Sequence, residues 1–438
     1  MKTDNSKNVL IYGLGYVGLT LAVFLASRGY NVIGIEKNVK TLNKINSGNA
    51  QFYELGFDLH LKNVLLSGNF IARKFDKNSI PFHEFPKTIF VTVGTPVLNK
   101  KLNNENLREV LSCLSKFTSI HDLILLRSTV YPGCTREMYN KYWPSEGPKM
   151  GFAPERTIEG NAWDELNQLP QLISGLNEKA LSSGLKFFQQ IKVPTETLST
   201  TEECELTKLF LNIERDVSFA LANEFAMIAQ EYNSNYSNIV KKSKNNYPRG
   251  KLQLPGTVGG PCLSKDSWIL SEALLNRKNI NSEDLLLKNA RLINENLINW
   301  FIQKSETWFF QKSSKNIKIL ICGLSFKGKP ATNDVRGSYV ENIKEAIDRK
   351  CNQLSINIEY YSGYDALCGE SQFKELSMLN FKAEQYDLVI IQNNNEENLK
   401  PLLDGSVFSN KTLYWDFWGI SKDMDFLEYI NKDLIISL

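Results

Sequence analysis

The sequence has few histidines and no paired cysteines. Its three histidines (His60, His83 and His121) are far apart, and its seven cysteines occur singly, without a Cys-x-x-Cys pair. Zinc sites need clustered ligands, and disulfide frameworks need an even set of cysteines at suitable spacing. We therefore expect no metal site and a reducing compartment, which indicates a cytoplasmic protein.

The sequence also lacks a charge bias and a membrane-spanning run. Against 51 lysines and arginines stand 48 aspartates and glutamates, so the formal net charge is only +3. This balance gives no electrostatic reason to expect a nucleic-acid partner. Residues 9–26 resemble the apolar core of a signal peptide, but three glycines interrupt them at a spacing that has its own explanation. No apolar run is long enough to cross a bilayer, so we expect no membrane insertion.

The chain does contain an alternation of apolar runs and helical segments. The runs that are typical of buried parallel strands are Val9–Tyr12, Asn31–Ile35, Thr88–Val93, Leu123–Leu126, Ile317–Cys322, Leu388–Gln392 and Thr412–Phe417. Leu19–Ser27 is typical of a helix that follows the first strand. This alternation predicts an α/β protein with doubly wound parallel sheets at both ends of the chain.

The middle of the chain has a different pattern. Residues 202–231 carry apolar residues at helical spacing without glycine or proline, which predicts one long helix. Residues 245–262 predict a loop rich in glycine and proline, and residues 264–306 are predicted to be helical again. We predict two Rossmann-like doubly wound domains joined by a helical central domain, with boundaries at 1–198, 199–312 and 313–438.

A dinucleotide-binding fingerprint joins the first strand to the first helix. It reads Gly13-Leu14-Gly15-Tyr16-Val17-Gly18. The first glycine makes a tight turn, the second admits a pyrophosphate, the third allows close helix–strand packing, and the helix N-terminus supplies N–H groups. Glu36, at the end of the second strand, can bind ribose hydroxyls and would repel a 2′-phosphate, so NAD is favoured over NADP. Thr95 and Ser128-Thr129 follow later strands, at the edge where such sheets bind ligands.

One cysteine has a distinctive setting. Cys262 follows the glycines of a flexible loop and precedes Lys265 and Asp266. A thiol placed beside a redox cofactor suggests oxidation through a covalent sulfur intermediate, and a nearby cation would favour the thiolate. We interpret the other six cysteines as small buried hydrophobic residues. Spacing alone leaves a structural role for Cys262 open.

Two further pairs are ambiguous from spacing alone. Lys208 and Asn212 are one helical turn apart and could hold an oxyanion, the lysine by charge and the amide by hydrogen bonding. An ordinary solvated helix face is the alternative. Glu155 and Glu159, which lie in one short segment, leave the same choice open.

The chain resembles the UDP-glucose/GDP-mannose dehydrogenase family from its first strand to its C-terminal domain. The matching motifs are Gly13–Gly18, Thr95-Pro96, Ser128-Thr129-Val130, Pro154-Glu155-Arg156, Lys208 with Asn212, Gly259-Gly260-Pro-Cys262 with Lys265-Asp266, and Gly323–Lys327 through Asp334–Ser338. The resemblance implies a UDP-sugar substrate, a C-terminal domain that binds its UDP part, and a homodimer built on the long helix. It also implies a four-electron oxidation of C6 from alcohol to carboxylate that uses two NAD in turn.

The resemblance implies roles for single residues. Cys262 captures the aldehyde as a thiohemiacetal and then carries the thioester, and Lys208 stabilises the oxyanions. Asn212 helps to bind the sugar, Asp266 assists proton transfer with Thr129, and Glu159 positions the hydrolytic water. The implied cofactor-binding residues are Gly13, Leu14, Gly15, Tyr16, Val17, Gly18, Glu36, Thr95, Ser128, Thr129, Lys265 and Arg336. The implied substrate-binding residues are Glu155, Arg156, Lys208, Asn212, Arg249 (from the neighbouring subunit), Gly259, Gly260, Phe326 and Lys327.

Some details point within the family and others depart from it. Pro154-Glu155-Arg156 and the Gly-Gly-Pro-Cys-Leu loop resemble the UDP-N-acetylhexosamine branch. UDP-N-acetylmannosamine is therefore the expected substrate, ahead of UDP-N-acetylglucosamine and UDP-glucose, in the synthesis of surface-polysaccharide precursors. Three C-terminal segments depart from the family pattern: Tyr364-Asp365, Asn393–Asn395 and the segment around Trp418. They leave open a degenerate NAD-binding regulatory protein. A hydroxyacid-type dehydrogenase is the nearest enzymatic alternative, but it needs neither Cys262 nor a second α/β domain.

Overall fold

The computed structural model describes residues 7–81, 87–245, 247–275, 280–281, 284–368, 377–378, 386–399, 402, 411–420 and 434–438. His83, and the asparagine at 246 that precedes the Arg249 motif, lie outside these residues. The chain divides into two compact units, which we describe separately: residues up to 211 with 268–280, and residues 212–267 with 281–438. The boundaries of the three predicted domains stay predictions.

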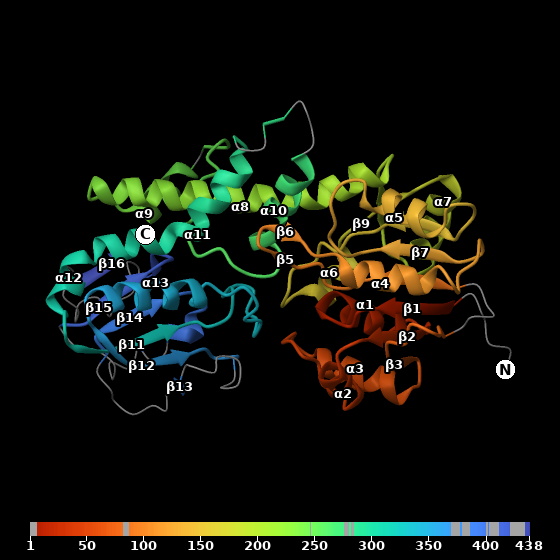
Figure 1. Cartoon of the computed structure of the whole chain (residues 1–438), viewed down its shortest axis with the longest axis horizontal. Coiled ribbons are helices and arrows are strands. Elements are labelled where there is room, and N and C mark those ends of the chain that lie inside the picture. Colours follow the sequence, from red (N-terminus) through yellow and green to blue (C-terminus); the bar gives the residue numbers. More distant parts are fainter. Residues whose placement is uncertain are drawn as a thin grey trace. The chain divides into compact units, whose positions relative to one another are not determined.

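The first unit contains a Rossmann-type sheet. Its strands are β1 (Asn8–Tyr12), β2 (Asn31–Glu36), β3 (Phe70–Lys74), β4 (Thr88–Val91), β7 (Leu123–Leu126), β8 (Lys149–Phe152), β9 (Gln171–Gly175) and β10 (Thr195–Thr197), with a separate hairpin of β5 (Val97–Leu98) and β6 (Lys101–Leu102). The sheet order is β10-β9-β8-β7-β4-β1-β2-β3, and only the β8–β9 pairing is antiparallel. Figure 1 labels β1, β2 and β3 next to one another at one end of this order. The strand order reverses between β1 and β4, which is where such sheets bind ligands.

Helices cover both faces of this sheet. They are α1 (Tyr16–Ser27), α2 (Val39–Asn46), α3 (Phe57–Leu66), α4 (Glu105–Leu114), α5 (Cys134–Tyr142), α6 (Ala162–Gln168) and α7 (Glu178–Gln190). Alternate residues of β1 enter opposite cores: Val9 and Ile11 join one cluster of buried side chains, and Leu10 and Tyr12 the other. A strand buried on both faces needs a continuous apolar run. The apolar stretch at residues 9–26 is therefore the core strand β1 and the buried helix α1.

The second unit contains a second Rossmann-type sheet. Its strands are β11 (Asn316–Cys322), β12 (Asn357–Tyr364), β13 (Ser377–Met378), β14 (Leu388–Ile391), β15 (Leu413–Asp416) and β16 (Ile435–Ser437). They pair in parallel in the order β13-β12-β11-β14-β15-β16. Figure 1 shows these strands together with helix α13 (Val340–Gln353), which follows β11 in the chain. The order reverses between β11 and β14, as it does between β1 and β4 in the first unit, so the predicted fold class is confirmed.

One long helix, α8 (Thr201–Glu231), begins in the first unit and ends in the second, as the sequence predicts. The other helices of the middle region are α9 (Tyr236–Ser243), α10 (Leu263–Leu274), α11 (Leu286–Lys304) and α12 (Glu306–Gln311). The helical prediction for 264–306 is wrong in part, because α10 ends at Leu274 and α11 begins only at Leu286. Helix α9 falls between the predicted long helix and the predicted loop and was not expected.

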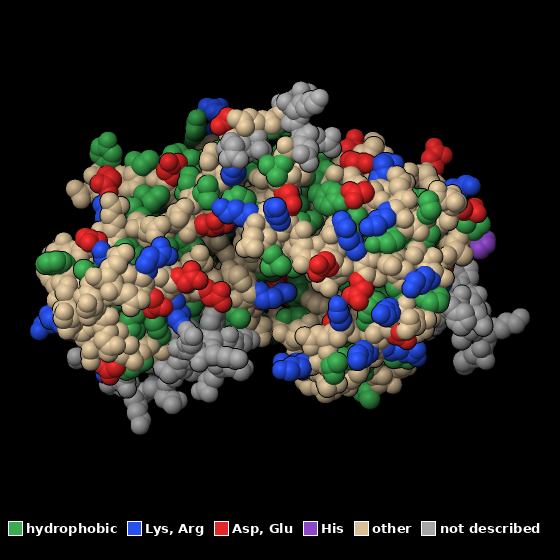
Figure 2. All heavy atoms as spheres, viewed as in Figure 1, with side chains coloured by type: hydrophobic (Ala, Val, Ile, Leu, Met, Phe, Trp, Pro, Cys, Tyr) green, Lys and Arg blue, Asp and Glu red, His purple; other side chains and the backbone are tan. Residues whose placement is uncertain are grey.

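The surface of each unit carries both charge signs. In the view of Figure 2, basic and acidic side chains are interspersed on the visible face of the first unit, as on that of the second. A basic stripe of the kind that tracks a nucleic-acid backbone is not seen on these faces. Among the described residues, no helix is both long enough and apolar enough to cross a membrane.

Candidate active site

The glycine fingerprint forms the turn between β1 and α1. Gly13 has a φ of +92°, which a residue with a side chain rarely adopts. A Cβ on Gly18 would lie 1.8 Å from the carbonyl oxygen of Gly13 and 2.5 Å from Thr92 Oγ1. The hydroxyl of Thr92 donates to the carbonyl oxygens of Tyr12 and Gly13, at 2.9 and 2.7 Å, and so fixes the turn. The outer glycines are therefore needed by the backbone itself.

The middle glycine has a different environment, and it suits a cofactor. A Cβ on Gly15 would meet no heavy atom of the described chain within 4 Å. Gly15 is the N-cap of α1, and no side chain caps the helix there. An open position over uncapped N–H groups fits a pyrophosphate. The residues present therefore fit the NAD that the sequence predicts.

Glu36 holds the same turn from the end of β2. Its Oε2 accepts a hydrogen bond from the backbone N–H of Leu14 at 2.8 Å, and its Oε1 accepts one from Asn38 N at 2.8 Å. The side chain is only partly buried, so lone pairs stay accessible for ribose hydroxyls. The carboxylate thus shapes the fingerprint turn besides its predicted role toward the ribose.

The loops after β4 and β7 are tied together beside this turn. Thr95 Oγ1 donates to the carbonyl oxygen of Thr129 at 2.7 Å, and Ser128 Oγ donates to the carbonyl oxygen of Val93 at 2.7 Å. Thr95 and Ser128 are buried, whereas Thr129 is partly exposed. Of these three predicted residues, Thr129 is the most exposed, and the contacts of all three with the cofactor stay predictions.

Tyr16 has a structural partner. Its hydroxyl donates to Glu54 Oε2 at 2.5 Å and accepts the backbone N–H of Gly160 at 3.0 Å. Burial, together with the hydrogen bond to the Glu54 carboxylate, raises the pKa of Tyr16 above its usual range. Tyr16 thereby links the fingerprint helix to the segment that holds Glu155 and Glu159, and its predicted cofactor contact stays a prediction.

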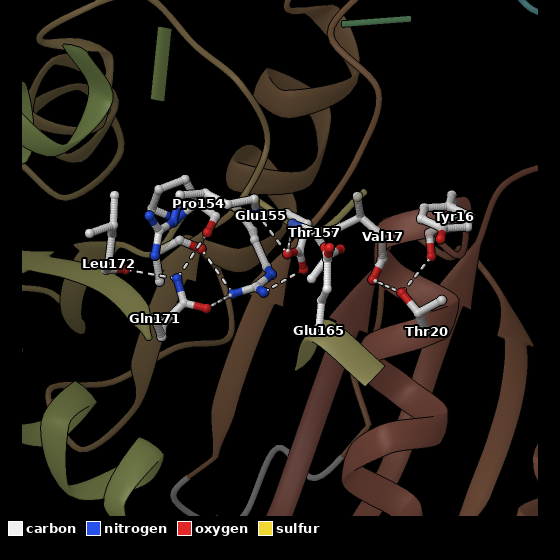
Figure 3. A network of polar contacts seen from close by, with 12 residues as sticks. Tyr16, Val17, Thr20, Pro154, Glu155, Thr157, Glu165, Gln171 and Leu172 are labelled. Carbon is white, nitrogen blue, oxygen red and sulfur yellow. Dashed lines mark hydrogen bonds and ion pairs between the residues drawn. The ribbon is translucent and has the colours of Figure 1, made fainter. Parts of the chain in front are cut away.

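Glu155 is buried in a polar network (Figure 3). Its Oε2 is 2.5 Å from Nη2 of Arg127, and its Oε1 accepts the backbone N–H groups of Arg156 and Thr157, at 2.8 and 2.9 Å. Burial would raise the pKa of Glu155, but Arg127 and these N–H groups together lower it. Gln171 accepts from Arg127 Nη1 at 2.6 Å and donates to the carbonyl oxygen of Pro154. Glu155 is therefore a fixed anion that orders its segment.

The neighbours of Glu155 are more accessible. Arg156 donates to the carbonyl oxygen of Pro170 and is partly exposed, as is Glu159. Lys208 is partly exposed on α8 within the same unit. Of the two glutamates, Glu159 has the more open environment, and its role toward water stays a prediction.

Cys262 lies in the second unit, immediately before the first residue of α10. All seven cysteines are described, and Cys262 is exposed while the other six are buried, as predicted. Backbone N–H groups of Lys265 and Asp266 point to its carbonyl oxygen, both at 3.2 Å. The positive end of the α10 dipole favours an oxyanion that forms next to this position.

The glycines before Cys262 pack against the C-terminal sheet domain of the same unit. Gly260 has a φ of +89°, its N–H donates to the carbonyl oxygen of Gly337 at 2.9 Å, and a Cβ there would lie 2.4 Å from the ring of Phe326. A Cβ on Gly259 would lie 2.4 Å from the carbonyl oxygen of Gly337. This close approach brings Phe326, with Lys327 beside it, to the cysteine loop.

Asn212 and Asp266 form a direct pair. Asn212 Nδ2 donates to Asp266 Oδ2 at 2.6 Å, and both side chains are buried. The ammonium of Lys265 lies 3.3 Å from Asp266 Oδ1. The structure therefore joins three of the predicted residues around the start of α10.

Three further predicted residues of this unit have contacts of their own. Arg336 forms an ion pair with Asp334 and is largely exposed. Arg249 is exposed, and its Nε donates to the hydroxyl of Tyr247 at 3.2 Å. The ammonium of Lys327 lies 5.5 Å from the centroid of the Phe326 ring. Their proposed roles toward cofactor and substrate stay predictions.

The sequence analysis includes Gly323–Lys327 as a family motif, but it missed that this motif forms a second glycine turn that matches the first. Gly323-Leu-Ser-Phe-Lys-Gly328 follows β11 with the spacing of Gly13–Gly18, and Gly323 has a φ of +86°. Asp365, directly after β12, accepts the N–H of Leu324 at 2.8 Å, as Glu36 accepts that of Leu14. Asp365 also accepts from Ser325, Leu367, Cys368 and Asn398, so its oxygens are occupied by protein donors. Asp365 therefore orders the loop, although its segment departs from the family pattern.

The sequence reading also missed a buried glutamate on α8. Glu205 accepts the backbone N–H of Gly133 at 2.6 Å, and the N–H and hydroxyl of Thr135 at 2.8 and 2.6 Å. It thereby caps the N-terminus of α5 and holds the end of the loop that carries Thr129. A charged residue among the buried positions of an apolar helix face is the signal that could have identified it.

We expect Glu205 to make stability depend on pH. Burial raises its pKa from 4.5 to about 7, although the three donors oppose the shift. Because the folded state holds the proton more tightly, stability decreases as pH rises from about 4.5 to about 7 and then levels off. The neutral isostere in Glu205→Gln does not share this loss. The melting temperature of Glu205→Gln should therefore rise relative to that of wild type between pH 5 and pH 8. If the difference between the two melting temperatures were the same at both pH values, Glu205 would not be the group that makes stability depend on pH.

Comparisons with known proteins agree with this geometry. Residues 7–192 match the NAD binding domain of the UDP-glucose/GDP-mannose dehydrogenase family, and residues 202–296 match its central domain. A UDP-N-acetyl-D-mannosamine dehydrogenase from Pyrococcus horikoshii is 31% identical over 373 residues, which are 82% of this chain and 85% of that protein. One from Methanocaldococcus jannaschii is 27% identical over 90% of this chain and 87% of its own length. A solved structure of the Pyrococcus horikoshii UDP-D-ManNAc dehydrogenase matches with a TM-score of 0.81 at 26% identity, over 98% of both chains.

Proposed function

Because the chain belongs to the UDP-glucose/GDP-mannose dehydrogenase family, we propose that it oxidises C6 of a UDP-N-acetylhexosamine, UDP-N-acetyl-D-mannosamine foremost, to the uronate. The cofactor is NAD, in accordance with the matched domain and the open position at Gly15. The observation that carries the proposal is Cys262, the exposed cysteine at the N-terminus of α10. The names of the two relatives support the choice of sugar.

The proposed reaction uses Cys262 to join two oxidations. When bound, NAD accepts the hydride that leaves C6 in each of them. The first oxidation converts the C6 alcohol to an aldehyde with loss of one proton, and the thiolate of Cys262 adds to the aldehyde carbon. Loss of the second hydride from this thiohemiacetal leaves a thioester on Cys262. Water then cleaves the carbon–sulfur bond, which releases the carboxylate and restores the thiolate. Because Cys262 captures the aldehyde, no free aldehyde leaves the protein.

Other side chains stabilise charge and move protons in this proposal. Lys208 provides a positive charge for the oxyanions that develop at C6. Asn212 and Asp266 act as the bonded pair seen in the structure, with Asn212 oriented toward the sugar by Asp266 and Asp266 handling a proton together with Thr129. Glu159, in its more open setting, positions the water that cleaves the thioester. Glu155 supports the segment as a fixed anion paired with Arg127.

The family resemblance and one surface feature support a homodimer. Helix α8 exposes large apolar side chains that a monomer would leave in water: Phe210, Leu211, Leu221, Phe225 and Ile228. Exposed apolar surface on one element is typical of a protein interface.

The substrate is tested by counting NADH per sugar. Wild-type protein is incubated with limiting UDP-N-acetylmannosamine, UDP-N-acetylglucosamine or UDP-glucose, and NADH is followed by its absorbance. We expect two NADH per UDP-N-acetylmannosamine, with the other two sugars turned over more slowly. Faster turnover of another sugar would reassign the substrate. No turnover of any sugar, in a protein that still binds NAD, would favour a regulatory NAD-binding protein.

A further inference from the structure

Two buried polar residues interrupt the apolar face of α11. The side chains of Ala290, Leu297, Ile298 and Phe301 are buried on this helix, and among them lie Arg291 and Asn294 with 1% and 0% of their surface exposed. A guanidinium is rarely so deeply buried unless its donors are engaged. The contacts of Arg291 therefore indicate what it does.

Arg291 donates hydrogen bonds to the cysteine loop before and after Cys262. Its Nη2 donates to the carbonyl oxygen of Val258 at 3.2 Å, and its Nη1 donates to that of Leu263 at 3.4 Å. These carbonyls lie four residues before and one residue after Cys262. The two ends of the segment that presents the sulfur are thus held by one rigid, planar group.

The guanidinium is itself anchored in α8 and α11. Nη1 lies 2.7 Å from Oδ1 of Asp216, and Nε lies 3.3 Å from Oε1 of Glu295. Asp216 is also held by Asn294 Nδ2 at 2.8 Å and by Ser267 Oγ at 3.1 Å.

The beginning of the same loop is also bound by a residue of α8. Asn223 on α8 accepts the N–H of Gly256 at 2.8 Å and donates to the carbonyl oxygen of Gly256 at 3.0 Å. Asn223 also donates to Oδ1 of Asn294 at 3.0 Å, which joins it to the Arg291 network. The whole path from Gly256 to Leu263 is therefore held by a buried and connected polar network.

We propose that Arg291 is a positioning residue for Cys262, which fixes the cysteine loop so that the sulfur stays at the N-terminus of α10. The catalytic meaning of this role rests on the proposed function, whereas the contacts themselves do not. Lysine cannot replace the arginine, because its single ammonium cannot bridge two carbonyl oxygens and a carboxylate in one plane.

The test compares Arg291→Lys with Arg349→Lys, an exposed position on α13. The first measurement is the rate at which iodoacetamide alkylates Cys262, followed by mass spectrometry of its peptide. We expect alkylation in Arg291→Lys to slow about tenfold or more, and kcat to fall on the order of 100-fold with little change in KM for NAD. Arg349→Lys should match wild type in both. Arg291→Lys that folds and keeps both rates within about twofold would overturn the proposal.

Folding is checked by thermal unfolding and by NAD affinity, which the first unit supplies. If Arg291→Lys does not fold, Asp216→Asn takes its place, since it removes the charge that orients Nη1 but keeps the side-chain shape. It should slow alkylation of Cys262 in the same direction, and an unchanged rate in folded Asp216→Asn would count against the role. If wild type turned over no UDP-sugar, the proposed function would be refuted. The alkylation test of Arg291 would still be valid, because alkylation of Cys262 needs no sugar.

Discussion

The Cys262→Ala variant is expected to form NADH from its UDP-sugar at least about 10³-fold more slowly than wild type, since removal of a catalytic nucleophile costs that much or more. Without the sulfur, the aldehyde from the first oxidation cannot be held as a thiohemiacetal, and no thioester forms. The variant keeps the glycine turn and Glu36, so NAD should bind as in wild type. The measurements are steady-state NADH formation and NAD affinity on the same preparation.

A second readout shows the covalent route directly. Rapid acid quenching of wild type during turnover should leave a mass increase on the peptide that contains Cys262. Cys351→Ala is the matched control, because it removes a buried thiol from α13 at a modest cost in stability. It should keep wild-type stoichiometry. Two NADH per sugar from Cys262→Ala would show that the second oxidation does not pass through this cysteine.

Seven of the sheet strands and the cofactor turn could be predicted because local sequence determines them, whereas strands such as β3, β8, β9 and β12 were not predicted. A parallel strand buried on both faces must be continuously apolar, and Leu123–Leu126 shows this with all four residues buried. The glycine turn could be predicted from its spacing, and the structure shows that Gly13 and Gly18 are required by atoms of the same turn and of Thr92 and Val93, which follow β4. Thr88–Val93 was predicted too long because the β-branched Thr92 and Val93 also favour a strand, although the pairing stops at Val91.

The supporting residues could not be predicted because long-range contacts define them. Glu205, Asp216 and Asn223 lie on the apolar face of α8 and are fully buried, but the sequence does not show which groups satisfy them. The partners that satisfy them are 33 to 78 residues away in the chain: Thr135, Arg291 with Asn294, and Gly256. No periodicity reveals such pairs. The apolar pattern of α8 also predicts burial where there is none, since Phe210 and Ile228 belong to the pattern but are exposed.

Exchange of Gly15 for alanine is expected to separate cofactor binding from folding. At Gly15 φ is −65°, which alanine adopts readily, and the Cβ would meet no atom of the described chain within 4 Å. The fold should therefore be as stable as wild type, or more stable by up to about 1 kcal/mol because the unfolded chain loses freedom. The new methyl group would occupy the position that suits the pyrophosphate. We expect the Kd for NAD to rise on the order of 10- to 100-fold, which corresponds to about 1.4–2.8 kcal/mol.

The matched variant Gly18→Ala should destabilise the fold instead. Its Cβ would lie 1.8 Å from a backbone carbonyl oxygen, and backbone in the turn between two core elements cannot move aside as a flexible side chain can. Overpacking of this kind costs roughly 3 kcal/mol or more, so a marked drop in melting temperature is expected with or without NAD. Calorimetric NAD titration and thermal unfolding of both variants measure the contrast. If Gly15→Ala bound NAD as tightly as wild type, the pyrophosphate could not lie over Gly15, and the cofactor would have to approach this sheet edge by another path.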